Sequence, residues 1–243
     1  GVPEERIVVI PNGINFNKFV ADADSLSDLA KHHRKEYQLE DKLVLGFTGF
    51  VREWHRLDRV LEVIAANQEQ NWHLFLVGDG PAREDLEKTA KKLGIESRMT
   101  ITGIVARDQM PGLVATFDIA LQPDVVEYAS PLKLFEYLAL VKAILAPNSE
   151  NIREILTDSE NALMFDTQQP SQFSEQLYRL CSSEELRHQL GEAAFETIEN
   201  QKLYWRHNAE KIVQLFDQQL TGATLDKKLF PNSIENESSQ VKN

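Results

Sequence analysis

The stretch "KLVLGFTGFVREWHRLDRVLEVI", residues 42–64, combines two kinds of secondary structure in a short length. An apolar run comes first and ends at Gly49, a polar loop follows, and apolar residues then recur at helical spacing. Such a unit is typical of a buried strand, a tight connection and a covering helix. Units of this kind build parallel sheets.

The same alternation continues along the whole chain. The other runs predicted as strands are "RIVVIP", "WHLFLVGDG", "MTITG", "DIALQP", "KAILAP" and "ALMF". Helical patterns lie at residues 58–70, 81–94, 107–116, 131–141, 150–157, 170–181, 183–200 and 203–219. We therefore predict an α/β fold, a Rossmann-like parallel sheet with helices on both faces. Ligands of such sheets bind beyond the carboxyl ends of the strands, where the strand order switches.

Two segments fall outside this alternation. Residues 18–40 are predicted as a polar connector that could contain one short helix. Residues 221–243 form a polar tail that is predicted to be disordered. Residues 1–220, which include this connector, are predicted to be one domain.

The composition limits the classes of function. Lys plus Arg number 26 and Asp plus Glu 38, so the net charge is −12, which argues against a general nucleic-acid surface. One cysteine, Cys181, allows no internal disulfide. No apolar run reaches the roughly 18 residues of a membrane span. The start, "GVPEERIVVIPNG", has no initiator Met or signal peptide and looks like the middle of a longer protein.

The first candidate site is the loop "GFTGFVREWHR", residues 46–56. Gly49 permits close backbone approach, and Arg52, His55 and Arg56 could hold a phosphate group. The alternative is a solvated surface loop that happens to be basic.

The second candidate is "LVGDGPAREDLEKTA", residues 76–90, where Gly78 and Gly80 stand between a strand and a helix. The third glycine of the dinucleotide fingerprint is missing, because position 83 is Arg. A structural turn is therefore favoured over a dinucleotide site.

The third candidate is "EYASPLKLFEYLAL", residues 127–140. Ser130 is predicted as the N-cap of a helix and Pro131 as its first residue, which leaves free N–H groups for an anion. Lys133 faces the positive helix end, and Glu136 lies three residues on, where a carboxylate suits a ribose diol. The alternative is an exposed Lys–Glu pair on an amphipathic helix.

Metal binding is not predicted. "DAD", Asp22–Asp24, follows no strand, and His32, His33, His188 and His207 lie in segments that read as helix surfaces. No zinc-ligand spacing is present.

Six motifs occur in an order that points to one family. They are "VIPNGINFNKF", "GFVREWHRLDRVLEVI", "LVGDGPAREDLE", "MTITGIVARDQMPGLVATFDIALQP", "SPLKLFEYLAL" and "ENALMFD". Together they resemble the C-terminal, nucleotide-sugar-binding half of a group-1 (family 4) GT-B glycosyltransferase, over about residues 1–219.

The resemblance implies a role for each motif. Residues 1–20, with Pro11, Asn12 and Gly13, would be the crossing from an N-terminal domain, and the helix at 203–219 would pack toward that domain. The donor would contact Gly49, Arg52, His55, Gly78, Gly80, Gly103, Ile104, Val105, Ser130, Pro131, Leu132, Lys133 and Glu136.

Within that set the implied roles differ. The backbone of Gly103–Val105 would meet the nucleobase, and the helix start the diphosphate. Lys133, Arg52 and Glu136 are the predicted catalytic residues, with the two cations stabilising the leaving diphosphate and Glu136 binding the ribose.

The sequence departs from the family pattern in two places. Family members often carry Arg directly after the first loop glycine and Lys-Gly later, where this chain has Phe50 and His55-Arg56. The first glutamate of the usual pair falls on Tyr128, with Glu127 one place away.

The resulting expectation is a transferase that moves a sugar from a nucleotide-diphosphate sugar, with retention, to a glycan or lipid-linked acceptor in polysaccharide biosynthesis. It would need no cofactor or metal and would work in the cytoplasm, with membrane contact at the inner face only through the missing half. Without that half, the chain is expected to be inactive or nearly so. The alternatives are a GT-B nucleotide-sugar 2-epimerase and a non-catalytic nucleotide-sugar- or partner-binding domain.

Overall fold

The computed structural model describes residues 3, 7–15 and 23–220, and everything below refers to this part of the chain. The chain divides into two compact units, Gly1–Trp205 and Arg206–Asn243. In the second unit the described residues belong to the helix α10, Trp205–Leu220, on which Ile212 and Phe216 are exposed. The predicted disordered tail, residues 221–243, lies outside the described residues.

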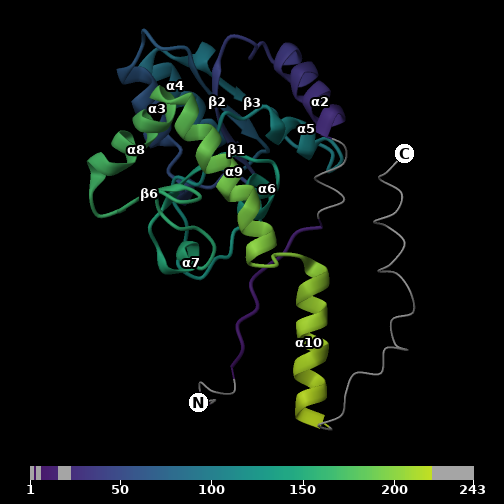
Figure 1. Ribbon diagram of the computed structural model, residues 1–243. Helices are drawn as coiled ribbons and strands as arrows, with labels where there is room; N and C mark the ends of the chain where they lie inside the picture. The colour runs from purple at the N-terminus through teal and green to yellow at the C-terminus, as the bar shows by residue number, and fades with distance from the viewer. Residues whose placement is uncertain (1–2, 4–6, 16–22, 221–243) are drawn as a thin grey trace. The chain divides into compact units, whose positions relative to one another are not determined.

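Six strands of the described part form one parallel sheet in the order β3-β2-β1-β4-β5-β6 (Figure 1). Their bounds are β1 Leu43–Thr48, β2 Trp72–Val77, β3 Met99–Ile101, β4 Ile119–Leu121, β5 Ala143–Pro147 and β6 Leu163–Phe165. Every residue of β2, β4, β5 and β6 is buried, as expected of a parallel sheet covered on both faces. The predicted α/β fold is confirmed.

Helices cover both faces because alternate strand residues point to opposite sides. Val44 and Ile144 pack in one core with α5, α6 and α9, whereas Leu45 and Leu145 pack in another with α3, α4 and α8. The bounds are α3 Asp58–Ala66, α4 Arg83–Leu93, α5 Met110–Ala115, α6 Leu132–Ala139, α8 Pro170–Ser182 and α9 Glu184–Asn200. The short helices are η2 Glu53–His55, η3 Glu96–Arg98 and α7 Glu150–Arg153.

One strand prediction is wrong. Within "RIVVIP", residues 7–10 are not in a strand, and Ile7, Val8 and Val9 are exposed by 57%, 48% and 67%. A β-branched run becomes a strand only when a neighbouring strand pairs with its backbone. No described strand lies beside these residues.

The polar connector holds a larger element than the short helix expected. Helix α2, Ala23–Glu36, packs against α5, as Figure 1 shows. Arg34 fixes it, because its Nη2 lies 2.7 Å from both Asp118 Oδ2 and the Thr116 carbonyl oxygen. Asp118 Oδ2 also accepts a hydrogen bond of 2.7 Å from the Val44 N–H. The ion pair therefore joins α2 to the start of β1.

Gly46 lets the ring of Phe117 lie directly against β1. A Cβ atom at position 46 would come within 2.0 Å of the Phe117 Cγ atom. Both residues are buried, so the ring has little room to withdraw.

We expect Gly46→Ala to lower the free energy of unfolding by about 1–3 kcal/mol, because it overpacks the core. Urea unfolding measures this. Gly94→Asn is the control, since position 94 has φ +69° and a Cβ there meets nothing within 4 Å. Asn tolerates that conformation. Equal unfolding free energies for the two variants would contradict the packing argument.

Candidate functional site

The order of the strands switches between β1 and β4. These strands are neighbours in the sheet, yet the chain continues from β1 to β2 on one side and from β4 to β5 on the other. The loops that follow β1 and β4 therefore diverge beyond their carboxyl ends and leave space for a ligand there. These loops carry the first and third candidate sites of the sequence.

Helix α6 begins at this edge. Its N-cap is Pro131, at φ −72° and ψ 110°, and the Leu134 N–H donates to the Pro131 carbonyl at 3.1 Å. The predicted N-cap, Ser130, is thus wrong by one residue, because Pro131 takes the extended conformation of the cap itself. The N–H groups of Leu132 and Lys133 have no acceptor within the helix, which favours an anion there.

A buried hydrogen bond fixes α6 to the switch. The Thr48 N–H, at the end of β1, donates to Tyr137 Oη at 3.0 Å. The same hydroxyl lies 3.5 Å from the Leu121 carbonyl oxygen at the end of β4. Tyr137 is fully buried, and burial raises the pKa of its hydroxyl. Lys133, one turn earlier on α6, is placed by this anchor.

Lys133 is a partly buried cation without an ionic partner. Its Nζ lies 3.6 Å from the centroid of the Phe47 ring, a cation–π contact. Burial lowers the pKa of Lys133 to about 7, and the charge of Glu136 opposes that shift. No carboxylate of the described residues lies within ion-pairing distance of this Nζ. Because this ammonium group is partly buried and has no counter-ion, binding of an added anion beside it would be favourable.

Glu136 is the matching unpaired acid. Burial raises the pKa of its carboxyl group, while the charges of Arg107 and then Lys133 oppose the shift. No hydrogen bond joins this carboxylate to another described residue. A partly buried carboxylate with free acceptor positions can take two hydrogen bonds from a ligand diol.

His55 and Gly49 approach Lys133 from the β1 loop. The His55 ring lies 4.8 Å from that of Phe47, between ring centroids, on which Lys133 also rests. A Cβ atom at Gly49, where φ is +122°, would come 3.4 Å from Lys133 Nζ. The structure thus brings Gly49, His55 and Lys133 together at one edge of the sheet.

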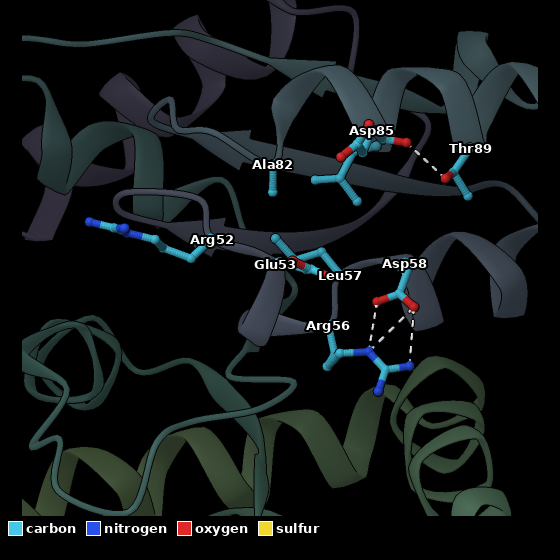
Figure 2. A pocket seen from close by; sticks show the side chains of 9 residues that line it. Arg52, Glu53, Arg56, Leu57, Asp58, Ala82, Asp85 and Thr89 are labelled. Atoms are coloured by element: carbon cyan, nitrogen blue, oxygen red, sulfur yellow. Dashed lines mark hydrogen bonds and ion pairs between the residues drawn. The ribbon is translucent and has the colours of Figure 1, made fainter.

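Arg52 does not share this position. Its guanidinium group lies 4.7 Å from the centroid of the Phe50 ring and 5.0 Å from that of Trp54, and both rings are exposed. In Figure 2 the Arg52 side chain points away from Asp85 and Thr89.

A hollow of about 410 Å³ borders the same loop. Its lining residues are Arg52, Glu53, Arg56, Leu57, Asp58, Ala82, Asp85, Leu86 and Thr89. Within it Arg56 is paired with Asp58, with Nε 3.2 Å from Oδ1 (Figure 2). Arg56 is thereby engaged by Asp58, and both Arg52 and Arg56 of the candidate residues border this hollow.

A family model described as "Glycosyl transferases group 1" matches residues 30–197. The chain belongs to this family. The resemblance seen in the sequence motifs is thereby confirmed, and the chain is a group 1 glycosyltransferase domain.

Two curated relatives illustrate the match. Alpha-D-kanosaminyltransferase of Streptomyces kanamyceticus is 23% identical over 175 residues, 71% of this chain and 45% of that protein. N-acetyl-alpha-D-glucosaminyl L-malate synthase of Bacillus anthracis is 26% identical over 187 residues, 76% of this chain and 47% of that protein. The chain spans about half the length of the curated relatives it matches.

Solved structures share the fold. Anabaena Alr3699/HepE in complex with UDP and glucose superposes with a TM-score of 0.78, at 17% identity, over 90% of this chain and 59% of that one. WaaG, a glycosyltransferase involved in lipopolysaccharide biosynthesis, gives a TM-score of 0.70, at 23% identity, over 83% and 54% of the two chains.

In the glycosyltransferase domain the paired glycines after β2 pack loops together. A Cβ atom at Gly78 would lie 2.2 Å from the Gly49 carbonyl oxygen, and one at Gly80 would lie 2.2 Å from that of Val51. The favoured structural turn is therefore present, and the predicted ligand contacts of these glycines stay predictions. Gly103 has φ +73°, Ile104 is 92% exposed, and Val105 packs against the core.

Asn12 makes a contact with the loop before α6 that the sequence motifs did not predict. Its Nδ2 donates to Ser130 Oγ at 2.8 Å, and the Ser130 carbonyl oxygen lies 3.4 Å away. The "IPNG" segment is thus tied to the residue before the α6 cap. No sequence pattern indicates this pairing, because the two residues are far apart along the chain.

Two further observations concern ligands and membranes. Within residues 3, 7–15 and 23–220, no group of three or more His, Cys, Asp or Glu side chains is placed to hold a metal ion. None of the described helices is sufficiently long and apolar to span a bilayer.

We expect Asn12→Ala to speed amide hydrogen exchange at residues 128–132 by about fivefold, because it removes a hydrogen bond worth about 1 kcal/mol. Hydrogen-exchange mass spectrometry measures the effect. Asn15→Ala is the matched control, since Asn15 is exposed and makes no hydrogen bond within the described residues. Identical exchange in the two variants would show that the contact does not order the loop.

Proposed function

We propose that this chain binds a nucleotide-diphosphate sugar at the β1/β4 switch and forms the donor half of a sugar transferase. The observation that carries the proposal is the unpaired Lys133 ammonium at a helix start, with the unpaired Glu136 carboxylate three residues later. A ligand that offers both an anion and a diol satisfies both groups at once.

The diphosphate is proposed to lie at the start of α6. The free N–H groups of Leu132 and Lys133 and the Lys133 ammonium would neutralise it. Negative charge grows on the diphosphate as the sugar leaves, so the same groups would stabilise the transition state more than the ground state. This assigns Lys133 a catalytic role that requires neither a cofactor nor a metal.

The rest of the donor is proposed to follow from this anchor. The ribose would donate hydrogen bonds to Glu136, and the base would meet the backbone at 103–105. Solved structures of Anabaena Alr3699/HepE contain UDP and UDP-glucose, which supports a donor of this type. Arg52 is proposed to add charge at the rim, where its guanidinium group stacks on Phe50 and Trp54.

The reaction is proposed to transfer the sugar with retention to a glycan or lipid-linked acceptor in the cytoplasm, or at the inner face of the membrane. The acceptor side would come from an N-terminal domain beyond this chain. We accordingly infer that the chain alone transfers sugar slowly or not at all.

The second candidate is a non-catalytic nucleotide-sugar-binding domain. One observation favours it. At the positions of the usual first glutamate, Tyr128 is 90% exposed and Glu127 is also exposed, so neither side chain is held toward the donor sugar.

We expect one of UDP-glucose, GDP-mannose and ADP-glucose to bind. Lys133→Ala should lower the affinity for that nucleotide sugar by roughly 10- to 100-fold, because a charge-assisted hydrogen bond is lost. Isothermal titration calorimetry measures this. Glu136→Ala should weaken it by about 5-fold. Lys92→Ala, an exposed residue on α4, is the control. A nucleotide sugar that binds equally to all four proteins would place the site elsewhere.

The same titration repeated across pH tests the charge of Lys133. Lys133 loses its proton in the free protein as pH rises through about 7, whereas a bound diphosphate raises that pKa again. Affinity should therefore be flat below pH 7 and fall by up to about tenfold per pH unit above it. Lys133→Arg stays charged and should abolish the slope. A slope that persists in Lys133→Arg would assign the titration to another group.

We expect this chain to turn over donor at least about a thousandfold more slowly than a protein that also contains the N-terminal domain, because the acceptor would no longer be positioned. Release of nucleotide diphosphate with a shared acceptor measures both rates. Equal rates would show that this chain holds the complete site.

A further inference from the structure

The loop between β4 and α6, residues 122–131, ends directly at the first turn of α6. Its middle is a turn, in which the Ala129 N–H donates to the Val126 carbonyl oxygen at 3.0 Å. Glu127 and Tyr128, which lie between these two residues, are exposed. One internal hydrogen bond in an exposed segment does not hold it in a single conformation. The position of the turn therefore depends on contacts with other elements.

Asn151, in the short helix α7, makes two such contacts. Its Nδ2 donates to the Ala129 carbonyl oxygen at 2.6 Å and to the Val126 carbonyl oxygen at 3.2 Å. Carbonyl oxygens can accept only from the NH₂ group of an amide, so Oδ1 faces the other way. There it accepts a hydrogen bond of 2.6 Å from Ser149 Oγ, at the N-cap of α7. The side chain of Asn151 thus holds both ends of the turn in a fixed orientation.

Helix α7 is itself anchored to the sheet. Ile152 is fully buried in the core that also contains residues of α6 and α9. The Asn148 N–H donates to the Phe165 carbonyl oxygen at the end of β6, at 2.8 Å. Arg153 Nη1 donates to Asn148 Oδ1 at 2.9 Å and to the Asn148 carbonyl oxygen at 3.1 Å. Asn151 therefore connects the exposed turn to a part of the fold that is held in place.

Two other side-chain amides bind the same loop near its ends. At its start the buried Gln122 donates from Nε2 to the Asp124 carbonyl oxygen at 2.5 Å. Near its end Asn12 donates to Ser130 Oγ. Asn151 acts between these two points, on the exposed middle of the loop.

We propose that Asn151 is a positioning residue for the nucleotide sugar, which holds the turn at residues 126–129 so that the start of α6 is ordered before the ligand arrives. The proposal rests on the proposed function. Ser130 and Pro131 alone separate Ala129 from the first residue of α6, so a displaced turn displaces the helix start. Ordering this segment in advance reduces the entropy that is lost on binding. Without it, only the fraction of molecules with an ordered turn binds the ligand.

Isothermal titration calorimetry with UDP-glucose, GDP-mannose and ADP-glucose tests this, using the one that binds the unchanged chain. Asn151→Ala removes both hydrogen bonds to the turn, and we expect about 5- to 10-fold weaker binding. Asn151→Asp keeps the shape but sets a carboxylate against two carbonyl oxygens, so its loss should be at least as large.

Asn148→Asp is the matched control for the added charge. Asn148 is exposed, and an aspartate there can still accept from Arg153. Its affinity should stay within about twofold of that of the unchanged chain. Equal losses in Asn148→Asp and Asn151→Asp, with none in Asn151→Ala, would assign the effect to charge and overturn the proposal.

A conservative variant separates positioning from a general loss of stability. Asn151→Gln carries the same amide on a longer side chain and should recover at least about half of the Asn151→Ala loss on a logarithmic scale. Thermal melting shows that each variant is folded. Affinities that follow the melting temperatures of the variants, and not the presence of the amide, would give Asn151 a purely structural role and overturn the proposal.

Hydrogen-exchange mass spectrometry measures the order of the turn directly. In the free protein we expect Asn151→Ala to speed exchange at residues 126–130 by about tenfold, with β4 and β5 unchanged. The saturating nucleotide sugar should remove most of this difference, because the ligand then orders the segment. Equal exchange in the two free proteins, or equal affinity, would overturn this proposal alone. If the unchanged chain binds none of the three nucleotide sugars, the proposed function falls, and this proposal falls with it.

Discussion

The buried hydrogen bond from the Thr48 N–H to Tyr137 Oη is the constraint on which the site depends. It joins the last residue of β1 to the helix that follows β4, across the point where the strand order switches. A backbone N–H at a strand end must find a partner once it is buried. Tyr137 provides it and thereby sets the position of α6 relative to β1. The open first turn of α6, Lys133 and Glu136 take their places from this anchor.

The site is a place where the fold tolerates unfavourable electrostatics. The partly buried Lys133 ammonium has no counter-ion, and its neighbours Gly49 and His55 carry no negative charge. Burying it in this way costs stability. Phe47 offsets part of that cost through its ring face, which Lys133 contacts at 3.6 Å. A depressed pKa in Lys133 and a raised pKa in Glu136 are what burial produces when no partner is present. A ligand that pairs with such unsatisfied groups at the carboxyl edge of a sheet removes this cost, so a pair of this kind is a candidate binding site.

The sequence predicted the sheet because strand, turn and helix signals agreed with each other in most units. It failed where a local pattern depended on distant partners. The run at residues 7–10 has the composition of a strand, but no described strand pairs with it. The segment that forms α2 is so polar that its sequence predicted a connector, whereas the ion pair of Arg34 with Asp118 holds it as a packed helix. The Lys133–Glu136 pair was visible from helix spacing alone. The Asn12–Ser130 hydrogen bond and the contact of Lys133 with the Phe47 ring could not be predicted. Each joins residues that are far apart in the sequence, and residues of these types occur in many places that are not sites.

Positions 55 and 56 show how one loop can depart from its family pattern and stay folded. Family members often have Lys-Gly there, and the glycine suits the left-handed conformation that Arg56 adopts at φ 51°. Arg56 pairs with Asp58, and its N–H donates to the Glu53 carbonyl at 3.0 Å, which offsets the strain of that conformation. That pairing turns the Arg56 charge toward the hollow beside α4. Arg52 is stacked on the rings of Phe50 and Trp54, whereas Lys133 lies in the first turn of α6 itself. The loop therefore shapes the edge of the candidate site and carries the rim charge of Arg52, and α6 supplies the charge of Lys133 at its own first turn.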